Sequence, residues 1–241
     1  MSTNGDVHDG TSRSSSSRTN SVPAACPSET VDELLQRVLD IQAEYADRPI
    51  HSYDELVHLI RTCDLKPFTR AGPLEKIYAQ EFLPRLKTEY GSTADYLLKR
   101  LDWTPEVIAE AQSTGRYFTR DIEDKYLRVR KNDWAYSVPK EYEHWLVWTL
   151  LPLVDWKHAT SYVQDRGLSG RFSPQKPELR IETEGCKTEG VCKELEAFAM
   201  ARWPDATDVM WLVNPVKLQS VPALAHAHFF IRTSKLPDSA T

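Results

Sequence analysis

The spacing of apolar residues changes partway along the chain, and this change most constrains the fold. In the first half, apolar residues recur every three or four positions, which is the period of an amphipathic helix. In the second half, residues 144–148, 208–213 and 225–232 are rich in β-branched and aromatic residues and indicate strands. Helices followed by strands predict an α+β fold, in which an N-terminal helical layer packs on a mostly antiparallel C-terminal sheet.

Local signals indicate where individual helices begin. Thr30 and Glu33 match the capping box, in which two side chains satisfy two otherwise unpaired backbone amides, and residues 52–55 repeat the pattern. Pro73 suits the first turn of a third helix. Pro84 is expected to kink or restart that helix, because proline has no amide hydrogen to donate.

The organisation of the chain follows from its composition. Residues 1–27 are rich in serine and threonine and poor in apolar residues, so we expect a disordered arm that cannot bury enough surface to order itself. The remainder, residues 28–235, is expected to form a single α+β domain. Within it, residues 161–177 indicate a loop and residues 191–203 a further helix.

Charge and hydropathy exclude two classes of partner. The formal net charge is −5 and the sequence pI is about 5.8, whereas a general nucleic-acid binder usually carries a basic face. No run of ~18 apolar residues occurs, so no membrane span is expected. We therefore expect no nucleic-acid partner and no membrane insertion, with a location in the cytoplasm or, as the alternative, the nucleus. No cofactor follows from the sequence.

The cysteines do not indicate a zinc site. Cys186 and Cys192 are six residues apart, but no second cysteine pair or nearby histidine accompanies them. A structural zinc site needs about four ligands. Free thiols in a reducing compartment are therefore the expectation.

Three segments carry a family resemblance when they are taken together. Their runs are Tyr90-Gly91-Ser92, Tyr96-Leu97-Leu98, Leu101-Asp102-Trp103, Asn132-Asp133-Trp134-Ala135-Tyr136, His144-Trp145-Leu146-Val147-Trp148-Thr149, Trp211-Leu212-Val213-Asn214 and His226-Ala227-His228. In this order and spacing they resemble the fungal N-acetylglucosamine-induced protein 1 family, over about residues 30–232. That family's domain is of unknown function, and the resemblance implies a cytosolic role in, or a response to, N-acetylglucosamine metabolism.

The chain departs from the family pattern at three positions. Ala135 and Ser137 stand where the family usually has proline and glycine, and Leu150 stands where it tends to have lysine. If that lysine serves a ligand, this member has lost or altered the function.

Alternating histidines near the C-terminus are the main candidates for chemistry. In a strand over residues 225–232, His226, His228 and Phe230 share one face, and the two imidazoles stand about 7 Å apart. His144 begins another strand and could join them from a neighbouring position. His226 and His228 are candidates for general acid/base or nucleophilic catalysis, or for metal binding, with a purely structural role as the alternative. No carboxylate lies at a fixed short spacing from them, which weakens the metal hypothesis.

Further polar residues are candidates for holding a ligand. Asn132 and Asp133 are also typical of a turn that bonds its own backbone, and His144 belongs to the histidine group. Asn214 ends a strand, and Gln219 and Ser220 closely precede the histidine strand. These candidates are Asn132, Asp133, Tyr136, His144, Asn214, Gln219 and Ser220.

Three functions stay open from the sequence. We expect a protein that binds a small polar ligand, such as a sugar or a nucleotide sugar. One alternative is a histidine-dependent nucleotidyl transferase or phosphohydrolase, by fold-level analogy with histidine-triad enzymes, although Phe230 occupies the place of the third histidine. The other is a non-catalytic adaptor that uses the helical half as its interface. Whether the protein is an enzyme is left open.

Overall fold

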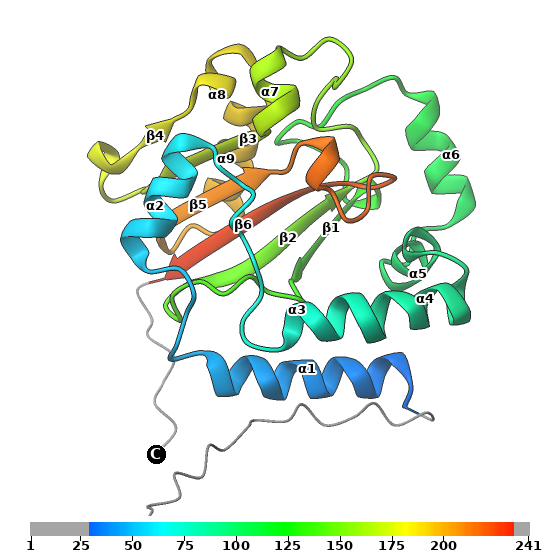
Figure 1. Ribbon diagram of the computed structural model, residues 1–241. Helices are drawn as coiled ribbons and strands as arrows, with labels where there is room; N and C mark the ends of the chain where they lie inside the picture. Colours follow the sequence, from blue (N-terminus) through cyan, green and yellow to red (C-terminus); the bar gives the residue numbers. More distant parts are fainter. Residues whose placement is uncertain (1–28, 234–241) are drawn as a thin grey trace, which may run out of the picture.

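The computed structural model describes residues 29–233, which form an antiparallel sheet with helices on both faces (Figure 1). The predicted disordered arm at residues 1–27 lies outside the described residues. In spatial order, the strands of the described sheet are β1 (Leu127–Lys131), β2 (Glu143–Thr149), β6 (Ala225–Thr233), β5 (Ala206–Val213), β3 (Leu168–Phe172) and β4 (Ile181–Glu182).

The α+β prediction is confirmed, and the three predicted strands are β2, β5 and β6. The helices of the first half are α1 (Val31–Tyr45), α2 (Tyr53–Thr62), α3 (Leu74–Ile77), the π-helix η1 (Tyr78–Phe82), α4 (Leu83–Tyr90), α5 (Thr93–Arg100) and α6 (Pro105–Ser113). Those of the second half are α7 (Ser161–Arg166), α8 (Glu184–Thr188) and α9 (Val191–Arg202), with short 3₁₀ turns η2 (Asp124–Tyr126), η3 (Pro177–Leu179) and η4 (Val216–Leu218).

The loop predicted over residues 161–177 is wrong, because that segment forms α7 and β3. Strand β3 is hard to predict because its polar residues find partners far away in the sequence. The Ser169 hydroxyl donates to the Ile60 carbonyl at 2.7 Å, and Arg171 forms a buried ion pair with Asp208. Gly170 is needed because a Cβ atom there would lie 2.7 Å from the Trp211 ring on β5.

Both predicted capping boxes are present, at Thr30 with Glu33 and at residues 52–55. The expected effect of Pro84 appears as a wide turn. The Leu83 amide donates to the Tyr78 carbonyl five residues earlier, as in a π-helix, and α4 restarts with Pro84 in its first turn. The ring nitrogen of the proline has no hydrogen to donate, so the wide turn places it where none is required.

Apolar side chains cover both faces of the sheet. On the near face in Figure 1, Leu56 and Ile60 of α2 share a buried cluster with Phe230 of β6. On the far face, Leu195 of α9 shares a buried cluster with Trp211 of β5. The sheet therefore lies between two helical layers, and the N-terminal helices cover the face that carries the histidines.

Helix α1 lies alongside α3 and α4 at the edge of the sheet (Figure 1). Leu34 and Val38 of α1 are fully buried in a cluster that includes Phe82, Tyr96 and Trp134. This packing fixes the positions of Tyr96 and Trp134, which matter for the site described below.

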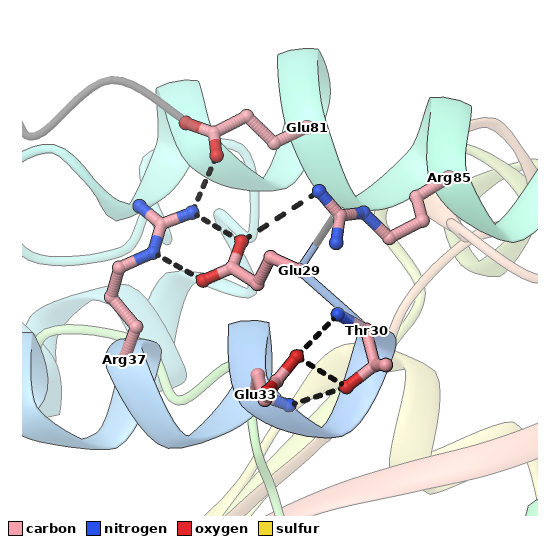
Figure 2. Close-up of polar contacts among 6 residues, drawn as sticks. All are labelled: Glu29, Thr30, Glu33, Arg37, Glu81 and Arg85. Carbon is pink, nitrogen blue, oxygen red and sulfur yellow. Dashed lines mark hydrogen bonds and ion pairs between the residues drawn. The ribbon is translucent and has the colours of Figure 1, made fainter. Parts of the chain in front are cut away.

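Ion pairs reinforce this attachment, as Figure 2 shows. The Glu29 carboxylate accepts from Nε of Arg37 at 3.1 Å and lies 3.6 Å from Arg85 of α4. Arg37 also pairs with Glu81. The start of α1 is thereby linked to the π-helix and to α4.

The expectation of free thiols at Cys186 and Cys192 is wrong. The two residues form a disulfide between α8 and α9, with Cα atoms 5.4 Å apart. This separation lies in the usual range for a disulfide, and the turn between the helices brings the two residues together. Cys63 is the free cysteine among the described residues, and burial raises the pKa of its thiol to about 11. Among residues 29–233, no helix is both long and apolar enough to cross a membrane.

Candidate functional site

The pairing of β2 with β6 brings the candidate histidines together on one face of the sheet. The register sets Leu146 opposite His228 and Trp148 opposite His226. The ring centroids of His226 and His228 lie 5.3 Å apart, and those of His144 and His228 lie 5.2 Å apart. The predicted shared face is therefore confirmed, and the two rings on β6 lie closer than the ~7 Å that strand rise alone gives.

A chain of hydrogen bonds assigns the tautomers of two histidines. The Tyr136 amide donates to Nδ1 of His144 at 3.0 Å, so the proton of a neutral His144 ring lies on Nε2. That Nε2 lies 3.0 Å from Nδ1 of His228 and donates to it, which leaves the His228 proton on Nε2. Nε2 of His228 lies 3.4 Å from the Asn214 side-chain amide, which must present its oxygen to the ring.

His226 differs because one of its ring nitrogens is unused. Its Nδ1 donates to the Leu224 carbonyl at 2.9 Å, so Nε2 of the neutral ring keeps a lone pair. Within residues 29–233 no group bonds to this Nε2, whereas both nitrogens of His228 are engaged. Trp148 lies against the ring, with centroids 4.5 Å apart. Of the two candidate catalytic histidines, His226 is the one available to a ligand.

Burial keeps all three imidazoles neutral. They are 5–6% exposed, and the loss of hydration disfavours the charged ring. Burial lowers the pKa of His144 to about 3 and also lowers the pKa of His226. The pKa of His228 falls well below its ordinary value, first because of burial and then because of its two histidine neighbours. At neutral pH these rings therefore act as donors and acceptors of hydrogen bonds and not as cations.

The predicted ligand residues Asn132 and Asp133 lie in a turn. The Asn132 side-chain oxygen accepts from the Trp134 amide at 3.0 Å, as a turn-forming asparagine does. The Asp133 carboxylate pairs with Arg100 of α5 at 2.9 Å. The turn thereby ties the segment after β1 to the helical layer.

Three of the other predicted residues surround the histidine network. Gln219 donates its side-chain amide to the Asn214 carbonyl at 2.8 Å. The Tyr136 ring stacks on His228 with centroids 5.3 Å apart, and burial raises the pKa of its hydroxyl while a hydrogen bond with Asn214 lowers it. Ser220 is exposed and stands apart from this network, at the edge of the pocket described next.

A pocket opens beside the histidine network, and we call it the basic pocket. Its cavity volume is about 90 Å³, enough for several water molecules. The described residues that line it include four cationic side chains but one carboxylate. The basic pocket is defined by Arg70, Tyr96, Arg100, Arg130, Lys131, Asp133, Trp134, His226 and His228.

Three lining residues of the basic pocket have a buried polar atom without a hydrogen-bond partner among the described residues. These atoms are Nε of Arg70, the hydroxyl of Tyr96 and Nε1 of Trp134. Tyr96 is 5% exposed and Trp134 is 7% exposed. Leaving a buried polar group unpaired costs about 1–3 kcal/mol, so such groups usually have a partner. The guanidinium and indole groups can only donate, so the missing partner must accept.

These three residues are not among the ligand residues predicted above. Tyr96 and Trp134 lie in segments that carry the family resemblance, which is the one signal that could have found them. Arg70 has no such signal. A backbone bridge between Arg70 and Tyr136 brings it to the pocket, where its guanidinium lies 3.9 Å from the centroid of the Tyr78 ring.

The structure explains the unusual residue at one family position and locates a second. Ser137 has no positive φ angle, so a glycine is not needed there, and its hydroxyl accepts from the Ile50 amide at 2.9 Å. Leu150 lines a second pocket. Phe230, at the place of a third histidine, stacks on Phe68 with centroids 5.6 Å apart.

In the described part of the chain, no three His, Cys, Asp or Glu side chains are grouped so that they could hold a metal ion.

Comparison with known proteins identifies the family and no activity. A family described as a protein of unknown function (DUF3605) matches residues 52–232. No curated protein matches the chain. HTC1, known from a crystal structure, is 19% identical in sequence; the match covers 77% of this chain and 85% of that one, with a TM-score of 0.48. Because the family match spans most of its length, the chain belongs to the DUF3605 family of proteins of unknown function.

Proposed function

We propose that the basic pocket binds a small anionic ligand. The observation that carries the proposal is that Arg70, Tyr96 and Trp134, which line the basic pocket, each have a buried donor without a partner among residues 29–233. A phosphate group has accepting oxygens in several directions, so it can satisfy more than one donor at once. Hydrogen bonds to such a charged group are about twice as strong as those between neutral groups.

The charges around the pocket support an anion. Its one carboxylate, Asp133, is already paired with Arg100 at 2.9 Å, so it repels a bound anion weakly. Arg70 is paired with Glu75 and Lys131 with Glu143, so Arg130 is the cation of the pocket that has no ion pair within residues 29–233, and it is exposed. The neutral histidines add no charge of either sign.

A sugar phosphate or a nucleotide sugar is the ligand class that we propose. The Nε2 lone pair of His226 can accept a hydrogen bond from a sugar hydroxyl, while the donors of the pocket hold the phosphate. Trp134 and Trp148 also line the pocket, but their buried rings already contact other rings, Trp134 those of Tyr78 and Phe82 and Trp148 that of His226. The resemblance to the N-acetylglucosamine-induced protein 1 family makes N-acetylglucosamine phosphates and UDP-N-acetylglucosamine the first compounds to test.

Histidine-dependent transfer or hydrolysis of that ligand is a second candidate. It is favoured by the free Nε2 of His226 at the pocket wall, which could take a proton from a ligand hydroxyl. His228 is less suited to act as a nucleophile because both of its nitrogens are engaged.

We also propose a location in the cytoplasm, with the nucleus as the alternative, which imaging of a tagged chain would test.

A thermal-shift screen tests the proposal. The panel holds inorganic phosphate, N-acetylglucosamine, its phosphates, UDP-N-acetylglucosamine, other nucleotides and divalent metals. A ligand at 100 times its Kd adds about 2.7 kcal/mol of stability, which raises Tm by roughly 5–10 °C for a domain of this size.

Matched arginine variants locate the binding. Arg130→Gln removes a cation of the pocket, whereas Arg61→Gln removes an exposed cation on α2 that lines no pocket described here. We expect a phosphorylated ligand to shift the wild type and Arg61→Gln equally, and Arg130→Gln less. The absence of a shift with every anion, or an equal loss in both variants, would contradict the proposal.

A further inference from the structure

We propose that the ligand site continues past His226 into a second pocket, and that the ligand is amphipathic. Its anionic end occupies the basic pocket and an apolar group occupies the second one. This inference rests on the proposed function and extends it. The second pocket, which we call the apolar pocket, is defined by Leu98, Ile108, Leu150, Leu153, Trp156 and Leu224, together with His226, and the uncharged polar residues Gln112, Thr149 and Gln219 also line it.

The two pockets are built on the same elements. His226 lines both of them. Helix α5 contributes Arg100 to the basic pocket and Leu98 to the apolar pocket. The segment before β6 divides in the same way, with Val221 in the first and Leu224 in the second. A ligand that contacts His226 from the basic pocket is therefore beside the apolar pocket.

The sizes of the pockets indicate a divided ligand. The cavity volume is about 90 Å³ for the basic pocket and about 390 Å³ for the apolar pocket. The smaller cavity suits a group of the size of a phosphate. The rest of a larger ligand needs other space, and the adjoining cavity provides it.

The lining of the apolar pocket indicates what that other part is. Among the described residues, no Asp, Glu, Lys or Arg lines it. A charged group placed there would lose hydration without gaining a partner, whereas an apolar group gains free energy from burial. We therefore infer a phosphate ester of an aliphatic or planar group. A nucleotide sugar has a planar base of this kind, whereas a simple hexose phosphate does not.

The junction between the pockets has a polar contact. The Nε2 lone pair of His226 can accept from a hydroxyl that links the two parts of the ligand. The Trp148 ring holds this imidazole from one side at a centroid distance of 4.5 Å. A ligand with an anion, a hydroxyl and an apolar end satisfies all three environments.

Calorimetric titration with a series of phosphates tests the inference. The probes are inorganic phosphate, ethyl phosphate and hexyl phosphate, with hexanol as the uncharged control. Each methylene that enters an apolar pocket tightens binding about fourfold, because its burial is worth about 0.8 kcal/mol. We expect hexyl phosphate to bind at least tenfold more tightly than inorganic phosphate.

Replacing alanine by tryptophan at three positions shows where the alkyl group of hexyl phosphate binds. Ala94→Trp and Ala223→Trp place a bulky ring in the apolar pocket, whereas Ala109→Trp alters an exposed position of α6 that lines neither pocket. The first two variants should bind hexyl phosphate no better than inorganic phosphate, while inorganic phosphate binds as in the wild type. The third variant should keep the full tenfold gain.

Failure of the inference is distinguishable from failure of the proposed function. If inorganic phosphate binds but hexyl phosphate gains nothing, or if the gain survives in both pocket variants, the apolar subsite is overturned and the anion site stands. If neither inorganic phosphate nor any of its esters binds, the proposed function is overturned and the inference with it.

Discussion

Replacing Tyr96 by phenylalanine is expected to separate stability from ligand binding. The ring packs against Phe82 with centroids 5.8 Å apart, and a phenylalanine would keep this contact. The hydroxyl is buried without a partner among the described residues, and burial raises its pKa, so it stays protonated at neutral pH. Removing a buried unpaired group recovers part of its cost of about 1–3 kcal/mol. The free energy of unfolding should therefore rise by about 1 kcal/mol, whereas most substitutions lower it.

Ligand binding should change in the opposite direction. In the proposed complex, the Tyr96 hydroxyl donates to the anion, and a hydrogen bond to a charged group is worth about 1.5–3 kcal/mol. Since 1.4 kcal/mol corresponds to a tenfold change in affinity, the Kd of an anionic ligand should rise about tenfold or more.

Urea denaturation and calorimetry measure the two effects on the same protein samples. Tyr142→Phe is the matched control, because the Tyr142 hydroxyl is also buried but donates to Asp208 at 2.7 Å. That variant should lose stability and bind the ligand normally. A Tyr96→Phe protein that is less stable than the wild type, or that binds anions equally well, would refute the reasoning.

The remaining predictions concern stability. The folded-state pKa values of the buried histidines lie below the unfolded value of ~6.5. As the pH falls below ~6.5, the unfolded chain therefore binds more protons than the folded protein does. The free energy of unfolding should then fall by up to about 1.4 kcal/mol per pH unit for each histidine, and for His144 this fall should end near pH 3. Urea denaturation at pH 7, 6 and 5 measures this slope. The slope should be smaller in the His228→Asn variant. Asp208→Asn should cost about 3–5 kcal/mol in the same assay, because it leaves the buried Arg171 guanidinium without its carboxylate; a loss below 1 kcal/mol would contradict this. Reducing the disulfide between α8 and α9 should lower the free energy of unfolding by about 2 kcal/mol, because the disulfide closes a short loop. Urea denaturation with and without a reductant measures this loss, and equal urea midpoints would contradict the prediction.

Local patterns explain what the sequence could predict about the fold. The shared face of His226 and His228 follows from the two-residue period of a strand, which depends on no other part of the chain. The helix starts at Thr30 and Ser52 are likewise set by residues three positions away. Strand β3 could not be predicted in this way, because the partner of Arg171 lies 37 residues later in the sequence.

The basic pocket was beyond prediction for a related reason. Its unpaired donors come from Arg70, Tyr96 and Trp134, on three separate segments that meet through tertiary packing. Whether a buried donor has a partner depends on that packing and not on any local pattern. The contact between His144 and His228 likewise depends on the register of β2 against β6, which pairs His144 with Phe230 and which the sequence left open.

The most direct test of the central claim is to locate an anion in the crystal. Crystals of the wild-type protein would be soaked in tungstate, a tetrahedral analogue of phosphate, and an anomalous difference map would be calculated. Binding in the basic pocket predicts a peak within hydrogen-bond distance of Nε of Arg70 and Nε1 of Trp134, weaker in crystals of Arg130→Gln. A saturating soak that leaves this pocket empty while tungstate binds elsewhere on the protein would contradict the account.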